Sequence, residues 1–354
     1  MTSTNGVPDA STLPITSAVR GEIRSSGVSR VPSTSEATRS GFCTSPWCLT
    51  GGPLSVPLLS EAVRVGIVIL PEHRWWVAEP KWRAAEEYGF HHAWTYDHLG
   101  WRSLVDGPWF GSVPTLTAAA AVTSRIRLGT MVASPNFRHP VPFARDLTTL
   151  DDISDGRFTL GIGAGGLGYD TEVLGAEQIS AGTRAGRFEE FVELLDSLLT
   201  KPSTTWQGEH FAAVEARSAP GCVQLPRIPF VIAANGPRTM RLAARFGQGW
   251  VTTGTDRESL DSWWRSVGEA CRRMDEALAS VGREPATLDR YLQSDACPQF
   301  SLSSREFFEE VLGRAAELGF TDVLAPWPRH DGVYAGAESV LEEVAAEVLP
   351  KLFT

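Results

Sequence analysis

The peptide Trp94-Thr95-Tyr96-Asp97-His98-Leu99-Gly100-Trp101 ends a short apolar segment, residues 92–96, whose aromatic and β-branched side chains predict a buried strand. Gly100 then interrupts any regular continuation. An acid and an imidazole, Asp97 and His98, therefore follow a strand end directly. In α/β folds, catalytic side chains are carried on loops at the carboxyl ends of strands, and His titrates near neutrality. The pair is either a catalytic site or a buried histidine satisfied by its neighbour.

The chain alternates strands and helices on both sides of this peptide. Apolar segments predict strands at residues 63–70, 92–96, 127–133, 157–163, 229–234, 249–253, 288–294 and 322–326. Helical spacing predicts helices at 81–88, 114–123, 141–153, 183–199, 237–246, 260–281 and 338–349. Eight strands alternating with helices, with strands apolar on both faces, indicate an α/β fold of the closed (β/α)8 TIM barrel type. Residues 201–229 interrupt the pattern after the fourth unit and predict an insertion, in which a hairpin lies over the barrel mouth.

Residues 1–60 differ in composition from the barrel domain, residues 61–354. They are rich in Ser, Thr, Pro and Gly, carry few charges and show no strand or helix period. Such a segment buries too little apolar surface to offset its ordering entropy, so we expect a disordered extension. It lacks the basic start and apolar core of a secretory signal.

Composition narrows the function. The net charge of −10 and the lack of Lys/Arg runs disfavour nucleic acid and anionic membrane surfaces as partners. No stretch approaches 18 consecutive apolar residues, so no membrane span is expected. Five scattered cysteines indicate no disulfide framework and suggest a reduced cytoplasm. The histidines lack metal-ligand spacing, and no Gly-x-Ser-x-Gly elbow is present, which disfavours metal and serine-hydrolase chemistry.

The residues after each barrel strand are expected to share one site. Gly236-Pro237 opens a helix and is a candidate phosphate site, because glycine allows close approach and a helix N-terminus attracts anions. The neighbouring Asn235 and the hydroxyl of Thr253 belong to the same region. An ordinary βα turn is the competing interpretation.

Other strand ends offer a ring-binding surface. Gly161-x-Gly163-x-x-Gly166 formally matches a dinucleotide fingerprint, but no helix opens directly after it, so we expect it to let a flat ring approach the backbone. The remaining candidates are Gly165 in that turn, Met131, Val132 and His139 after the third strand, and Trp101 and Trp109 for stacking on a planar ligand.

Several short motifs occur in a characteristic order. They are Trp94-Thr95-Tyr96-Asp97-His98, Arg127-Leu128-Gly129-Thr130, Arg138-His139-Pro140, Leu150-Asp151-Asp152-Ile153-Ser154-Asp155-Gly156-Arg157, Gly161-Ile162-Gly163-Ala164-Gly165, Ile232-Ala233-Ala234-Asn235-Gly236-Pro237 and Gly247-Gln248-Gly249-Trp250. Together they resemble the bacterial luciferase-like superfamily, in particular its deazaflavin (F420)-dependent oxidoreductases, from about residue 65 to 349.

The resemblance implies a flavin-like ring at the strands' carboxyl ends and hydride transfer to or from a substrate on its exposed face. His98 would hold the proton beside the reacting carbon, a role that suits a pKa near neutrality. Asp97 would contact the ring or fix the imidazole, and Trp101 would line the substrate side. A non-prolyl cis peptide would fall at Met131-Val132. The family also commonly forms homodimers through early helices.

The family's sugar-phosphate dehydrogenases carry a glutamate after the fourth strand and a lysine after the sixth. This chain has Gly166 and Asp256 near those places, which indicates an uncharged small-molecule substrate. The leading hypothesis is an F420-dependent oxidoreductase. An FMN-dependent luciferase-like monooxygenase using reduced flavin and oxygen is the alternative. A non-catalytic cofactor-binding barrel and an NAD-dependent dehydrogenase are more remote.

Overall fold

Eight parallel strands close into a barrel in the computed structural model, which describes residues 63–166 and 168–353. The strands are β1 (Arg64–Val68), β2 (His92–Thr95), β3 (Arg127–Thr130), β4 (Phe158–Ile162), β7 (Phe230–Ala233), β8 (Gly249–Thr252), β9 (Asp289–Gln293) and β10 (Asp322–Pro326). Each strand pairs with the next of this set, and β10 pairs with β1 to close the ring. The predicted (β/α)8 barrel is confirmed, whereas the predicted extension over residues 1–60 lies outside the described residues.

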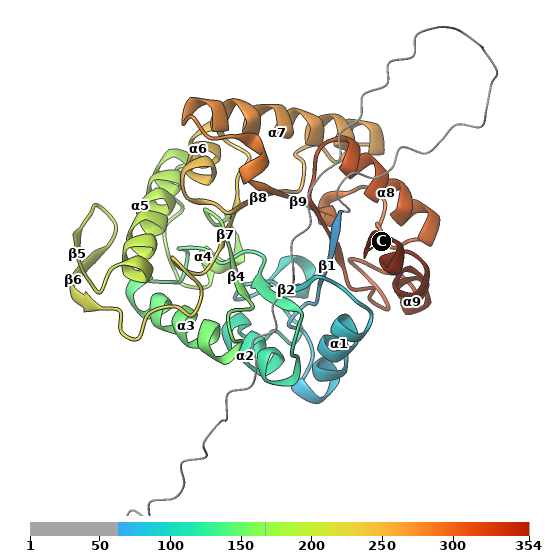
Figure 1. The fold of residues 1–354 in the computed structure, drawn as a ribbon, viewed down its shortest axis with the longest axis horizontal. Coiled ribbons are helices and arrows are strands. Elements are labelled where there is room, and N and C mark those ends of the chain that lie inside the picture. The colour runs from blue at the N-terminus through green and yellow to red at the C-terminus, as the bar shows by residue number, and fades with distance from the viewer. Residues whose placement is uncertain (1–62, 167, 354) are drawn as a thin grey trace, which may run out of the picture. The chain divides into compact units, whose positions relative to one another are not determined.

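Helices surround the barrel as an outer ring (Figure 1). They are α1 (Trp75–Glu87), α2 (Ser112–Val122), α3 (Pro140–Ile153), α5 (Ala181–Thr200), α6 (Pro237–Phe246), α7 (Leu260–Ser280), α8 (Arg305–Glu317) and α9 (Glu338–Glu347). The short helix α4 (Tyr169–Glu172) lies inside this ring and contacts the loop after β2. Four 3₁₀ turns complete the set: η1 (Arg102–Leu104), η2 (Pro285–Thr287), η3 (Ser294–Ala296) and η4 (Leu349–Phe353). Across residues 63–166 and 168–353, no helix is long and apolar enough to cross a membrane.

Three helices differ from the sequence prediction. The short helix α4 was not predicted, because the residues after Gly166 were expected to stay irregular. Helix α1 begins at Trp75, ahead of the predicted start at residue 81, and continues through Pro80. Helix α8 was not predicted. Ser304 caps its N-terminus, and Phe307, Phe308 and Val311 bury its inner face.

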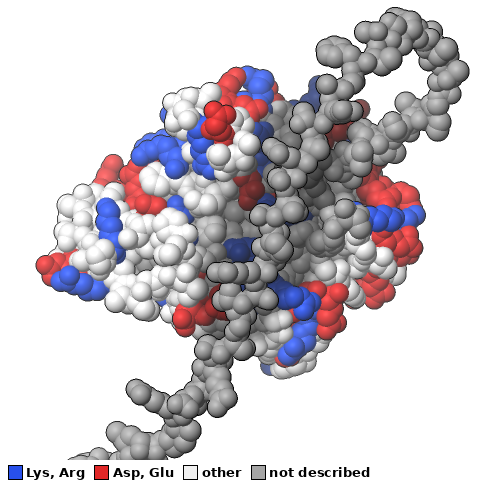
Figure 2. All heavy atoms as spheres, viewed as in Figure 1, with Lys and Arg blue, Asp and Glu red and all other residues white. Residues whose placement is uncertain are grey.

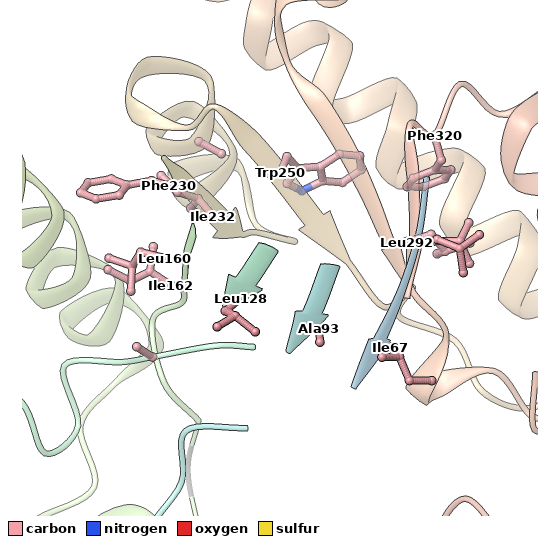
Figure 3. Packing of buried hydrophobic residues seen from close by; sticks show 14 of the residues in the cluster. Ile67, Ala93, Leu128, Leu160, Ile162, Phe230, Ile232, Trp250, Leu292 and Phe320 are labelled. Atoms are coloured by element: carbon pink, nitrogen blue, oxygen red, sulfur yellow. The ribbon is translucent and has the colours of Figure 1, made fainter. Parts of the chain in front are cut away.

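Side chains of the barrel strands alternate between two cores. The outward set packs against the helices and includes Ile67, Ala93, Leu128, Ile232, Trp250 and Leu292 (Figure 3). The inward set includes Val68, Trp94, Val231, Val251, Tyr291 and Leu324. All of these residues are nearly inaccessible to solvent. The strands are therefore buried on both faces, which explains their continuous apolar sequence.

Aromatic side chains fill the interior of the barrel on the side away from the carboxyl ends of the strands, and glycines on neighbouring strands make room for them. A Cβ at Gly66 would overlap the ring of His92, and one at Gly129 would overlap the ring of Trp94. His92 is fixed between two partners: Trp94 Nε1 donates to its Nδ1 (2.6 Å), and its Nε2 lies 2.9 Å from Asp322 Oδ1. This packed layer closes the barrel below the site.

The insertion after the fourth unit forms the hairpin of β5 (Ser203–Gln207) and β6 (Ala212–Arg217). It is anchored to α5, since Thr204 Oγ1 donates to the carbonyl of Ser197 (3.1 Å). The carboxylate of Glu190, also on α5, accepts backbone hydrogen bonds from the hairpin turn at His210 and Phe211 (both 2.9 Å). The hairpin was predicted, but its expected place over the barrel mouth was wrong, because these contacts hold it against the outside of α5 (Figure 1).

Basic and acidic side chains are interspersed over the face shown in Figure 2. Cations pair with neighbouring carboxylates, as in Arg238 with Glu189 (2.6 Å) and Arg305 with Glu347 (2.7 Å). On the face shown, this mixture gives no continuous basic surface of the kind that binds nucleic acid.

Candidate active site

A cavity of about 280 Å³ opens at the carboxyl ends of the strands. Its lining consists of Tyr96, His98, Trp101, Met131, Val132, Ala233, Ala234, Asn235, Val251, Thr252, Thr253, Gln293 and Asp295. These residues end or follow β2, β3, β7, β8 and β9, so the barrel brings distant parts of the sequence to one place. Of the predicted site residues, His98, Trp101, Met131, Val132, Asn235 and Thr253 line the cavity. Asp97, Trp109, His139, Gly163, Gly165, Gly236 and Pro237 lie outside its lining.

The His98 imidazole is held by a carboxylate that the sequence did not reveal. Its Nδ1 lies 2.6 Å from Oδ2 of Asp170, the second residue of α4. The other oxygen of Asp170 accepts from the backbone N–H of Leu99 (2.8 Å), and Trp109 Nε1 donates to the His98 carbonyl (2.8 Å). With Nδ1–H donated to a carboxylate, Nε2 is the nitrogen left to exchange a proton. Trp109 thus supports the His98 backbone.

Asp97 does not contact the His98 imidazole, which corrects the expectation that it fixes that ring. Both of its oxygens accept from Arg138, at 2.8 Å from Nε and 2.6 Å from Nη2. Ser112 Oγ donates to the same carboxylate (2.5 Å). Asp97 is buried, and the Arg138 side chain is 15% exposed. The contacts join the loop after β2 to the loop after β3 and to the first turn of α2.

The Met131–Val132 peptide is cis, at the place that the resemblance implied. Gly163 leaves room for the side chain next to this peptide, because a Cβ there would lie 2.8 Å from Val132 Cγ2. Gly165 has φ +75°, and a Cβ there would lie 2.6 Å from Asn136 Cγ. Both glycines are therefore explained by packing within the protein, whereas the sequence suggested that they admit a flat ring.

His139 caps a helix. Its Nδ1 accepts from the backbone N–H of Val141 (3.2 Å) at the start of α3, and its ring packs edge-on against Phe211 of the hairpin turn. These contacts give His139 a structural role at the start of α3.

The Gly236-Pro237 turn begins α6 with Gly236 at the N-cap and Pro237 in the first turn. No side chain caps this helix, and a Cβ at Gly236 would meet only Thr239 Oγ1, at 3.8 Å. Beside it, Thr252 Oγ1 donates to Asn235 Oδ1 (2.8 Å). An uncapped helix N-terminus with open space before it suits an anionic group.

Polar groups on the wall between β2 and β9 form a chain of hydrogen bonds. Gln293 Nε2 donates to the Tyr96 hydroxyl (2.9 Å), which lies 2.9 Å from the Tyr334 hydroxyl. Tyr334 in turn donates to Asp295 Oδ2 (3.5 Å). Trp101 packs edge-on against Tyr96 and stacks on Tyr334. Burial raises the pKa of both tyrosines above their ordinary value, so both hydroxyls keep their protons.

Gln293, the last residue of β9, and Asp295 were not among the predicted site residues, although the strand itself was predicted. Asp295 has an 8% exposed side chain, and burial raises the pKa of its carboxyl. Its Oδ1 is buried and has no hydrogen-bond partner among the described residues. Within the same part of the chain, no group of three or more His, Cys, Asp or Glu side chains is arranged to hold a metal ion.

A closed barrel with an imidazole and a polar cavity at the strands' carboxyl ends defines a TIM-barrel enzyme. The chain belongs to the luciferase-like monooxygenase family, whose model matches residues 80–338. The F420-dependent glucose-6-phosphate dehydrogenase of Beutenbergia cavernae is 29% identical over 315 residues, which cover 76% of this chain and 90% of that protein.

Solved structures show the same fold. The coenzyme F420-dependent tetrahydromethanopterin reductase of Methanopyrus kandleri has a TM-score of 0.65 at 19% identity, covering 83% of this chain and 100% of that one. A monooxygenase from Streptomyces bottropensis has a TM-score of 0.64 at 20% identity, covering 81% and 99%. The protein is accordingly an oxidoreductase of the luciferase-like family.

Proposed function

We propose that the protein transfers a hydride between the deazaflavin cofactor F420 and an uncharged small organic substrate. The observation that carries the proposal is the His98 imidazole on the cavity wall, held through Nδ1 by Asp170 at 2.6 Å. A hydride transfer needs a nearby group that takes up or supplies the accompanying proton, and an oriented imidazole is suited to that role. The F420-dependent relative in Beutenbergia cavernae, matched over 90% of its length, supports the choice of cofactor.

The residues present fit such a cofactor. The open N-terminus of α6 at Gly236-Pro237, with Thr253 nearby on the cavity wall, would hold its phosphate. Met131 and Val132 would support its ring on the apolar side of the cavity. When bound, the deazaflavin would carry the hydride.

The chain's own residues would handle the proton and the surroundings. His98 would take or give a proton at Nε2, while Asp170 keeps Nδ1 protonated and the ring in one orientation. Trp109 fixes the backbone of the same residue (2.8 Å). Trp101, 8% exposed, would exclude water from the substrate side.

The lining supports an uncharged substrate. No Lys or Arg is among the described residues that line the cavity, so a phosphate or carboxylate would lack a cationic partner there. Asp256, near the place of the family's sugar-phosphate lysine, accepts from Ser262 Oγ (2.7 Å) at the start of α7. The proposal therefore departs from the glucose 6-phosphate named for the Beutenbergia cavernae relative.

A competition titration tests the cofactor. Purified protein should bind F420 at micromolar concentration, measured by fluorescence quenching, and FMN should displace it poorly. His98→Ala should keep the affinity and lose at least about 100-fold in turnover, the size expected for a general acid–base group. Binding of FMN without F420 would instead identify the FMN-dependent monooxygenase, and binding of neither would refute both.

A second variant tests the phosphate position. Gly236→Asp should weaken F420 binding about tenfold through charge repulsion. Its thermal stability should stay unchanged or rise slightly, because Asp is a good N-cap. Gly313→Asp is the matched control, since it adds the same charge at an exposed glycine of α8 with no atom within 4 Å of the new Cβ. Equal F420 affinity in both variants would place the phosphate elsewhere.

A further inference from the structure

The carboxylate of Asp295 differs from the other buried carboxylates near the cavity. Asp97 uses both oxygens on Arg138, and Asp170 uses both on the His98 segment. Asp295, in contrast, has one buried oxygen, Oδ1, without a hydrogen-bond partner among the described residues. Its side chain is 8% exposed and lines the cavity. Burying a carboxylate oxygen without a donor is unfavourable, so this atom needs a partner from outside the chain.

The surrounding network does not supply that donor. Gln293 donates to Tyr96, and Tyr334 donates to Asp295 Oδ2, so the Tyr96 hydroxyl must give its proton to Tyr334. Both tyrosine hydroxyl protons are therefore used within this series of hydrogen bonds, which ends at Oδ2 of Asp295. Arg102 Nη2 also approaches Oδ2, at 3.4 Å. The donors converge on one oxygen and leave Oδ1 as a free acceptor.

The charge of Asp295 is already balanced in part by Arg102. A neutral donor is therefore sufficient at Oδ1, and an anionic ligand group is repelled. The adjoining surface is aromatic, since Trp101 packs against Tyr96 and Tyr334. A compact apolar body carrying a hydroxyl matches this combination of an acceptor and aromatic faces.

We propose that Asp295 is a specificity-determining residue whose Oδ1 accepts a hydrogen bond from a neutral hydroxyl group of the substrate. This assignment rests on the proposed function for the identity of the site, and it adds a second point of recognition to His98. Tyr96 connects the two points, because its ring packs edge-on against His98 and its hydroxyl is linked through Tyr334 to Asp295. Substrates that lack the hydroxyl leave Oδ1 unpaired and bind more weakly.

A matched pair of probes tests the proposal: cyclohexanol, which donates a hydrogen bond, and methoxycyclohexane, which does not. Binding of each to the F420-loaded protein is measured by saturation-transfer NMR titration. Wild type should prefer the alcohol roughly tenfold, as expected for one hydrogen bond to a charged acceptor. Equal affinity for the two probes would overturn the proposal without any variant being needed.

Asp295→Asn gives the sharper test. Tyr334 and Arg102 are donors, so they hold the amide oxygen in the place of Oδ2 and leave the NH₂ group in the place of Oδ1. The variant should therefore lose the preference for the alcohol and favour the ether, whose oxygen accepts. Asp331→Asn, the same change at an 82% exposed side chain, should keep the wild-type ratio. An unchanged ratio in a folded Asp295→Asn protein would refute the role of this oxygen.

Failure of the proposed function is distinguishable from failure of this inference. If the cofactor assignment is wrong, addition of F420 produces no fluorescence quenching, and this is measured separately. The same probe pair is then titrated into the cofactor-free protein, because Oδ1 belongs to the chain itself. A retained alcohol preference there would support the inference, and its absence would overturn it.

Discussion

Replacing Asp97 with Ala should cost mainly stability, because its carboxylate is a buried structural anchor. Three hydrogen bonds end on it: two from Arg138, at 2.8 and 2.6 Å, and one from Ser112, at 2.5 Å. Hydrogen bonds to charged groups contribute about 1.5–3 kcal/mol each, which sets an upper limit of about 9 kcal/mol for the three. The Arg138 side chain is 15% exposed and recovers part of this by hydration. We therefore expect a loss of about 3–5 kcal/mol, the range for breaking one partner of a buried ion pair.

Equilibrium unfolding in urea measures this loss. Asp331→Ala removes a carboxylate whose side chain is 82% exposed and should change stability by less than about 0.5 kcal/mol. The double variant Asp97→Ala/Arg138→Met should be less destabilised than the sum of the single changes, by about 2 kcal/mol, because it leaves no unpaired guanidinium. A stable Asp97→Ala protein with greatly reduced turnover would refute the structural role and restore Asp97 to catalysis.

Three further outcomes are expected. Gly129→Ala should lower stability by about 3 kcal/mol or more in urea unfolding, since its Cβ would overlap the Trp94 ring, whereas Gly313→Ala on the exposed face of α8 should be neutral or stabilising. Glu86 accepts three backbone N–H bonds that, against the opposing effect of burial, hold its pKa at about 2. This depressed pKa stabilises the fold above the ordinary value of 4.5, and the contribution is lost as the pH falls toward 2. Glu86→Gln should therefore cost about 1–2 kcal/mol at pH 7 and progressively less below pH 4.5, as followed by urea midpoints at several pH values. Asp170→Asn should lower turnover about 10–100-fold with unchanged F420 affinity, since the imidazole loses the acceptor that fixes its tautomer; weaker F420 binding instead would place this residue at the cofactor.

The barrel was predictable because its signals are local. Strand segments such as β10 and helices such as α6 have the bounds that the apolar period and the flanking Gly and Pro indicated. The hairpin position was not predictable, since it depends on Glu190 of α5 reaching the hairpin turn. That contact joins segments about 20 residues apart and leaves no periodic trace.

The site was predictable only as far as the topology determines it. Strand ends of a closed barrel must meet, so the sequence alone predicts His98, Asn235 and Thr253 at one mouth, where the structure has them. The hydrogen-bond partners were not determined in this way. Asp170 reaches His98 from a short helix that follows a glycine-rich turn, and the sequence between Gly163 and that helix has no regular period.

The pairing of Asp97 with Arg138 instead of His98 has a physical cause, which also bears on Gln293 and Asp295. Side chains alternate between the two faces of a strand, and here the alternation continues beyond the strand ends. Tyr96 and His98 line the cavity, so Asp97 between them turns outward to Arg138.

The same alternation operates after β9. Gln293 and Asp295 line the cavity, while Ser294 between them bonds outside it, to Ser301 Oγ (2.8 Å) and the Leu324 carbonyl (2.9 Å). After β2 and β9, neighbouring residues therefore belong to different environments and residues two apart share one, whereas after β7 and β8 the consecutive residues 233–235 and 251–253 all line the cavity. Applied to the sequence, this spacing pairs His98 with Tyr96 and Asp295 with Gln293, and it separates His98 from the acid next to it.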